Sequence, residues 1–295
     1  MLRAALLAPA LAALAWQTNA PLPVARTEVA AARHGDAIVV VGGYLADGST
    51  TARADVYVPS SDTWRRAPDL PVAVNHGAAV TLGGRAVVAG GYTDPGGPSR
   101  GVYRLEDGRW SSLPRLPFRR AAAGAAALGG TLYVVGGVGP AGLARNALAY
   151  ARGRWRAIPG PTPREHLAVA ASGGRLYAIA GRTAGFDTNL ALVESWRPGE
   201  RRWRREPSVP EPRGGTGAAA VGTTIVSAGG EAVSGTLGKV FGFDVRARRW
   251  TPLPDLPTPR HGLGVVSVGS TVYVLGGGPQ PGLHVSAANE SLALP

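Results

Sequence analysis

The 295-residue chain contains 43 glycines, 25 prolines and no cysteine, which excludes a disulfide framework, a thiolate nucleophile and a cysteine-ligated metal. So many glycines and prolines favour short strands joined by turns over long helices. The formal charge is +12, but the arginines that carry most of it are scattered. With no recognition motif to support it, a nucleic-acid partner is not expected.

The first fifteen residues match the pattern of a secretory signal peptide. Arg3 supplies the positive charge, residues 4–12 form a short apolar run, and Ala13-Leu14-Ala15 fits the small-x-small cleavage site. The run is too short to anchor the chain in a bilayer, and no later segment is apolar enough to cross one. We expect removal of residues 1–15 and a secreted or periplasmic protein of bacterial type. The alternative is an alanine-rich helix that the mature protein keeps.

From Trp16 onward, two markers recur with a period of about 47 residues, which is typical of repeat proteins. The first marker is a glycine pair: Gly42-Gly43, Gly90-Gly91, Gly136-Gly137, Ala180-Gly181, Gly229-Gly230 and Gly276-Gly277. The second marker is a tryptophan: Trp16, Trp64, Trp110, Trp155, Trp203 and Trp250. Six copies of each marker predict six repeats.

Every repeat has the same order of segments. An Ala/Gly-rich segment, a tight turn and a β-branched run lead into the glycine pair; a variable loop, a third strand, a polar turn and the tryptophan strand follow. Four short antiparallel strands, repeated six times, predict an all-β six-bladed propeller over residues 16–295. The sixth repeat ends at Pro295 without a tryptophan strand. We therefore expect residues 16–26 to form the outer strand of blade six and to close the ring.

The glycine pair, the aromatic residue after the third strand and the tryptophan about 20 residues beyond the glycines resemble kelch repeats. The resemblance covers nearly all of residues 16–295 and implies a kelch β-propeller like the central domain of galactose oxidase. Ala180 and Val74 depart from the repeat pattern at single positions. Without cysteine, the Cys–Tyr copper centre of galactose oxidase cannot be present. The resemblance implies no single activity, because the fold carries binding scaffolds and enzymes alike.

Five repeats carry an arginine sixteen residues before the glycine pair: Arg26, Arg120, Arg164, Arg213 and Arg260. At the start of the innermost strands, these side chains should surround the channel mouth. Guanidinium groups bind carboxylate and phosphate oxygens in pairs, so we predict an anion-binding pocket that also includes His76, His166 and His261. The alternative is that these arginines bond backbone carbonyl groups or nearby acids and have a structural role.

Catalytic residues are only weakly indicated. Glu28, Glu165 and His166 are candidates for acid–base work, although neighbours on a strand, such as Glu165 and His166, should point apart. By the same reasoning His261, one residue out of phase with His76 and His166, should face the other way. No HxH, HExxH, P-loop or dinucleotide motif is present, so neither a metal nor a cofactor is expected.

The variable loops after the second strands should share one face with the channel mouth, and we predict ligand binding there. We expect an exported kelch propeller that binds a protein, a glycan or an acidic small molecule at the arginine-rich mouth. The alternative is a carbohydrate-acting enzyme similar to sialic acid mutarotase, an epimerase whose substrate carries a carboxylate. The sequence leaves open whether the protein is an enzyme.

Overall fold

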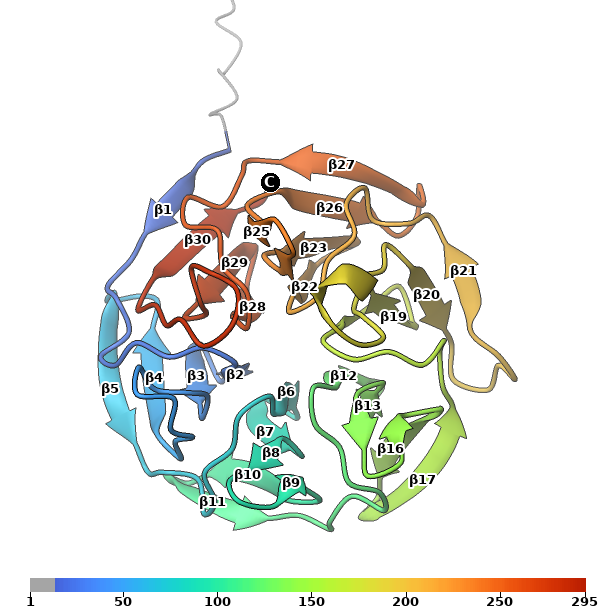
Figure 1. Ribbon diagram of the computed structural model, residues 1–295, viewed down its shortest axis with the longest axis horizontal. Helices are drawn as coiled ribbons and strands as arrows, with labels where there is room; N and C mark the ends of the chain where they lie inside the picture. Colours follow the sequence, from blue (N-terminus) through green and yellow to red (C-terminus); the bar gives the residue numbers. More distant parts are fainter. Residues whose placement is uncertain (1–13) are drawn as a thin grey trace, which may run out of the picture.

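Six four-stranded antiparallel sheets surround a common axis in the computed structural model, which describes residues 14–295 (Figure 1). Each blade is built from its inner strand outward, so the fourth strand lies at the rim. The all-β, six-bladed architecture is confirmed. Most of the predicted signal peptide, residues 1–13, lies outside the described residues, and its removal stays a prediction.

The strands of each blade run from the axis to the rim in the following order. Blade one contains β2 (Ala30–His34), β3 (Ala37–Val41), β4 (Ala54–Val58) and β5 (Thr63–Ala67). Blade two contains β6 (Ala78–Leu82), β7 (Arg85–Ala89), β10 (Val102–Glu106) and β11 (Arg109–Ser112). Blade three contains β12 (Gly124–Leu128), β13 (Thr131–Val135), β16 (Asn146–Ala151) and β17 (Arg154–Pro159). Blade four contains β18 (Ala168–Ser172), β19 (Arg175–Ile179), β20 (Val193–Trp196) and β21 (Arg204–Glu206). Blade five contains β22 (Gly217–Val221), β23 (Thr224–Ala228), β26 (Val240–Asp244) and β27 (Arg249–Leu253). Blade six contains β28 (Gly264–Val268), β29 (Thr271–Leu275), β30 (Asn289–Ala293) and β1 (Trp16–Thr18).

Blade six is completed by the start of the chain, as predicted. Strand β1 pairs antiparallel with β30, with Trp16 opposite Leu292 and Thr18 opposite Glu290. Figure 1 shows β1, in dark blue, lying along the outer side of β30. This pairing covers the edge of β30 that would otherwise present unpaired backbone groups.

The repeated tryptophans join each blade to the one before it. Each indole N–H donates a hydrogen bond of 2.7–2.9 Å to a carbonyl oxygen four residues after the tryptophan of the preceding blade. The pairs are Trp16–Pro254, Trp64–Ala20, Trp110–Pro68, Trp155–Pro114, Trp203–Pro159 and Trp250–Pro207. The tryptophans therefore lie between blades, which agrees with a structural role for this marker.

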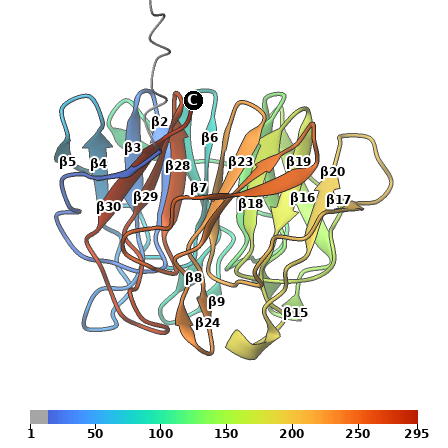
Figure 2. The same cartoon turned by 90° about the horizontal axis from the view of Figure 1, so that it is seen from above.

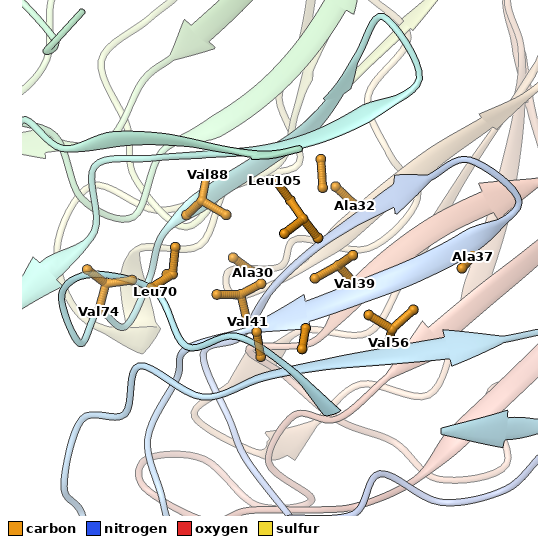
Figure 3. Packing of buried hydrophobic residues seen from close by; sticks show 13 residues of the cluster. Ala30, Ala32, Ala37, Val39, Val41, Val56, Leu70, Val74, Val88 and Leu105 are labelled. Atoms are coloured by element: carbon orange, nitrogen blue, oxygen red, sulfur yellow. The ribbon is translucent and has the colours of Figure 1, made fainter. Parts of the chain in front are cut away.

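The hydrophobic core lies between neighbouring blades. In the cluster of Figure 3, Val39 and Val41 of β3 pack with Val88 of β7 and Leu105 of β10. Each fully buried side chain of this size contributes about 1.5–3 kcal/mol to stability. The inner strands carry alanine and glycine instead, because only small side chains fit where the blades converge.

The two faces of the propeller differ. Figure 2 shows small additional hairpins and a short helical turn on one side, opposite the tight turns that join the blade strands. These elements are β8–β9 (Tyr92–Thr93, Gly97–Pro98), β14–β15 (Val138–Gly139, Gly142–Leu143), β24–β25 (Glu231–Ala232, Gly235–Thr236) and the 3₁₀ helix η1 (Phe186–Thr188). We call this side the loop face; the connections from each blade to the next also lie on it. Within residues 14–295 no helix has the length and apolar character needed to span a membrane.

Candidate functional site at the channel mouth

Two consecutive residues from each blade line a pocket at the axis, just before the inner strand begins. We call the first residues of these pairs the axial ring: Glu28, His76, Ala122, His166, Gly215 and Gly262. All six have φ between 50° and 64°, in the left-handed region that non-glycine residues seldom adopt. Each lies two residues after the repeated arginine position, so the shared conformation belongs to the repeat itself.

Backbone hydrogen bonds hold the axial ring together. The amides of His76, Ala122, His166, Gly215 and Gly262 each donate to the carbonyl of the equivalent residue in the preceding blade, at 2.9–3.1 Å. The amide of Val29 closes the ring by donating to the carbonyl of Gly262 at 3.1 Å. These bonds satisfy the backbone groups of the turn and fix where the ring side chains start.

The pocket inside the axial ring has a volume of about 120 Å³. Further along the axis, the channel is lined mostly by alanine, glycine and valine residues at and just before the inner strands. The channel opens on the opposite face into a cavity of about 410 Å³ that is walled mainly by alanines. Polar chemistry is therefore concentrated at the loop-face end of the channel.

Glu28 lies at the centre of a buried polar cluster. Its Oε2 is 3.1 Å from His76 Nε2, and its Oε1 is 3.2 Å from His261 Nδ1. His261 Nδ1 is also 3.4 Å from Glu231 Oε2. The His76 and His166 rings meet edge to face, with centroids 4.8 Å apart. Side chains from blades one, two, four, five and six thus converge on one point.

A second layer of charges surrounds this centre. Arg182 Nη1 lies 2.8 Å from Glu231 Oε1, and its Nε lies 3.4 Å from Glu165 Oε1. His166 Nδ1 lies 3.2 Å from Glu165 Oε1, but the two groups are not aligned, and Nδ1 has no hydrogen-bond partner. We call the following seven residues the axial cluster: Glu28, His76, Glu165, His166, Arg182, Glu231 and His261.

The surroundings shift the pKa values of this cluster in opposite directions. Burial lowers the pKa of His76 to about 4, and the nearby Glu28 carboxylate only partly opposes this effect. Burial also acts on His261, but its hydrogen bond to Glu28 and the charges of Glu28 and Glu231 outweigh it and raise its pKa. Burial would raise the pKa of Glu28, yet the three histidines hold it well below its usual range. At neutral pH Glu28 is therefore ionised and His76 is neutral, while the pKa of His261 is shifted toward its protonated form.

The pKa of Glu165 is also lowered. Burial raises it, but the contacts with His166 and Arg182 outweigh burial. Glu28 and Glu165 are therefore held ionised inside a small site, a pattern common at functional sites.

The five repeated arginines do not face the channel. Arg26, Arg164, Arg213 and Arg260 are fully buried, and Arg120 is 5% exposed. Arg164, for example, donates to the carbonyl oxygens of Ala178 and Ala180 and pairs with Glu194 in its own blade. Arg26 and Arg260 make the same kind of bonds, to Asp55 and Glu290. Their guanidinium groups lie inside the blades, so the expected anion pocket of converging arginines does not form.

The predicted histidines and acids do come together, including two that were expected to point elsewhere. His166 approaches Glu165, its neighbour in sequence, and His261 points at Glu28. Strand alternation fails here because the axial-ring residues have left-handed backbone conformation and are not part of a strand. This local kink turns neighbouring side chains toward the same space.

Arg182, Tyr44 and Tyr92 were not among the predicted site residues. The tyrosine rings flank His76, at centroid distances of 5.9 and 5.5 Å. All three residues directly follow a glycine pair and pair with the residue after the repeated arginine position. Their shared position directly after the glycine pair is the sequence signal that could have identified them.

Comparison with known proteins agrees with the repeat pattern. Residues 76–277, more than half of the chain, match the family described as the KLHDC2/KLHL20/DRC7 Kelch-repeats domain, and residues 25–71 match the Kelch motif. Human Kelch repeat and BTB domain-containing protein 13 is 35% identical over 117 residues, which is 37% of this chain. The match spans 25% of that human protein. The chain belongs to the kelch-repeat family.

Proposed function

We propose that the protein is a protein-binding module and that its partner docks on the loop face. Six large hydrophobic side chains are exposed within residues 14–295: Leu14, Val72, Phe118, Phe186, Val233 and Leu283. All except Leu14 lie on the loop face. Val72 and Phe118 belong to the connections that follow blades one and two, and Phe186, Val233 and Leu283 belong to loops of blades four, five and six. This one-sided distribution carries the proposal, because exposed apolar groups gathered on one face are typical of interaction sites.

The loops of blades four, five and six offer the best-defined part of this surface. Val233 is 75% exposed at the tip of β24–β25, and Leu283 is 56% exposed in the next blade. Thr236 Oγ1 donates to the carbonyl of Pro279, and the Asn189 side-chain amide donates to the carbonyl of Glu231. These bonds between loops reduce the entropy that a partner must remove on binding.

Membership of the kelch-repeat family supports the same reading, because kelch propellers commonly act as protein-binding modules. The charge of +12 favours a partner with an acidic surface, since long-range attraction speeds its approach. We also propose, from the pattern in residues 1–15, that the protein acts after export. Amino-terminal sequencing of the protein recovered outside the cytoplasm, with Trp16 as its first residue, would support this placement.

The docking face can be tested by comparing captured proteins. Immobilised wild-type protein is exposed to an extract of its native cells and their medium, and bound proteins are identified by mass spectrometry. Phe186→Glu, Val233→Glu and Leu283→Glu are combined in one variant. The control combines Ser60→Glu, Pro198→Glu and Ala247→Glu, three exposed positions on turns of the opposite face. Both variants gain the same charge, so a difference between the proteins that they retain shows which face of the propeller the partner binds.

We expect a partner that the wild type and the control retain and the loop-face variant loses. Equal retention by all three proteins would show that the loop face is not the docking site.

A glycan, an acidic small molecule or the sugar of a mutarotase-like reaction is the second candidate ligand. Glu28 beside His76 in an axial pocket favours it, since two side chains that can take part in proton transfer meet there. The pocket volume of about 120 Å³ opposes it, because small-molecule sites usually measure about 300–1,000 Å³. A thermal-shift series with sialic acid and neutral sugars tests this alternative; an unchanged melting temperature with every sugar would count against it.

A further inference from the structure

The axial ring brings two imidazoles and one carboxylate from three different blades to one point. One donor atom each of Glu28, His76 and His166 lies within 4.8 Å of the other two. We propose that these three side chains bind a divalent transition-metal ion, with Zn²⁺ best suited to two nitrogens and one oxygen. The pocket of about 120 Å³ has room for an ion and a few water molecules.

The hydrogen bonds around His76 leave its Nε2 free to act as a metal ligand. The Asn75 amide nitrogen donates to Thr50 Oγ1 at 2.8 Å, so Asn75 Oδ1 is the acceptor that faces His76 Nδ1 at 2.6 Å. Nδ1 therefore carries the proton, and Nε2 has a lone pair. That lone pair faces a Glu28 carboxylate oxygen at 3.1 Å. Two acceptors in contact need a shared cation or proton, and a metal ion supplies the positive charge.

His166 gives an independent sign of a missing partner. Its side chain is only 8% exposed, it lines the pocket, and its Nδ1 has no hydrogen-bond partner. A buried polar group without a partner destabilises a fold, so such groups are usually explained by an unseen ligand. On His76 the outer group is Asn75, whose Oδ1 faces Nδ1 and orients the ring.

The charge of the axial cluster also favours a cation. Three carboxylates, those of Glu28, Glu165 and Glu231, face a single guanidinium, that of Arg182. Arg182 spans Glu165 and Glu231, which leaves Glu28 to be balanced by histidines alone. A divalent ion beside Glu28 would offset this excess of negative charge.

A second group, Glu28, Glu231 and His261, has similar spacing but fits a metal less well. His261 Nδ1 lies between oxygens of Glu28 and Glu231, and its Nε2 contacts the carbonyl oxygen of Gln280 at 3.0 Å. Both nitrogens face acceptors and are needed as donors, so neither has a lone pair to offer. His261 therefore holds Glu28 in place and is not itself a ligand.

The test is calorimetric titration of Zn²⁺ into the full chain after EDTA treatment and dialysis. We expect one ion per chain. His166→Ala and Glu28→Gln should each weaken binding by at least about 100-fold, and Asn75→Ala, which removes only the orienting group, by about 10-fold. Alanine already occupies the equivalent ring position at Ala122 with φ of 50°, so His166→Ala requires no new backbone geometry.

Controls separate the axial site from incidental binding. His284→Ala removes an exposed histidine on the loop face and should leave the affinity unchanged. Circular dichroism in EDTA checks that each variant is folded, and visible absorption of the Co²⁺ form reports nitrogen ligation in the wild type. The proposal is overturned if wild type binds no Zn²⁺, or if folded His166→Ala and Glu28→Gln bind it as tightly as wild type does.

Discussion

The indole nitrogen of Trp16 donates a hydrogen bond of 2.8 Å to the carbonyl oxygen of Pro254, 238 positions away in sequence. The bond is the sixth copy of a link that occurs once between every pair of adjacent blades. The junction between the two ends of the chain is therefore built like the five junctions that lie within it. This equivalence can be measured.

We predict that Trp16→Phe and Trp64→Phe destabilise the propeller to a similar extent. Each substitution keeps an aromatic ring but removes one indole hydrogen bond, at a cost of about 1 kcal/mol plus a small packing loss. Free energies of unfolding from urea titrations of both variants provide the measurement. A far smaller effect for Trp16→Phe would mean that the β1 junction contributes little to stability.

Arg164 provides a second prediction, because its guanidinium is buried and paired with Glu194. Arg164→Met keeps much of the side-chain volume but leaves Glu194 without its charge partner. We expect a loss of about 3 kcal/mol in the free energy of unfolding, as is typical of broken buried ion pairs. Adding Glu194→Leu should restore part of the loss. If Arg164→Met is as stable as wild type, the assignment of this arginine to the scaffold fails.

The repeat markers made the fold predictable because each recurs for a mechanical reason. Gly43 allows a close approach: a side chain there would meet the carbonyl oxygen of Thr27 at 2.4 Å. Trp64 bridges two blades. Such requirements repeat six times, so they stand out against the variable residues between them. The same logic placed residues 16–26 beside β30.

The site was harder to predict because its chemistry does not repeat. Glu28, His76 and His166 occupy a position where the other three blades carry alanine or glycine. The direction of the His261 side chain was predicted wrongly from strand alternation, because the left-handed ring residues precede the strands. The repeated arginines attracted attention because they recur at one position of the repeat. They recur because they form hydrogen bonds within each blade, and not because they bind a ligand.

Glu206 supports a prediction about pH. Burial raises its pKa, but the Ser195 hydroxyl and the guanidinium groups of Arg204 and Arg248 outweigh burial and lower it. A carboxyl whose pKa is lower in the folded state stabilises the fold above its unfolded pKa of about 4.3. That contribution disappears as the pH falls through the lower, folded value. Wild type should thus lose more stability than Glu206→Gln between pH 6 and pH 3.

Urea unfolding at both pH values measures this difference, with Asp36→Asn, an exposed acid, as the control. Asp36→Asn should follow wild type. If Glu206→Gln and wild type lose the same free energy of unfolding between the two pH values, the contacts from Arg204 and Arg248 add nothing to stability.

A comparison of Gly262 with Gly269 separates two effects on stability: the crowding of a side chain in the axial ring and the left-handed backbone conformation. Gly262 and Gly269 share the same φ of 59°, but only Gly262 is crowded: an added Cβ would lie 2.6 Å from Glu28 Oε1, whereas nothing lies within 4 Å at Gly269. Gly269→Ala should therefore cost only the left-handed penalty of about 1 kcal/mol. Gly262→Ala should cost about 2 kcal/mol more, because the added Cβ would also lie 2.8 Å from the Glu28 backbone nitrogen and would displace the Glu28 carboxylate from His76 and His261. Urea unfolding of the two variants gives both values, and equal losses would show that the backbone and side chain of Glu28 can both shift without cost to the fold.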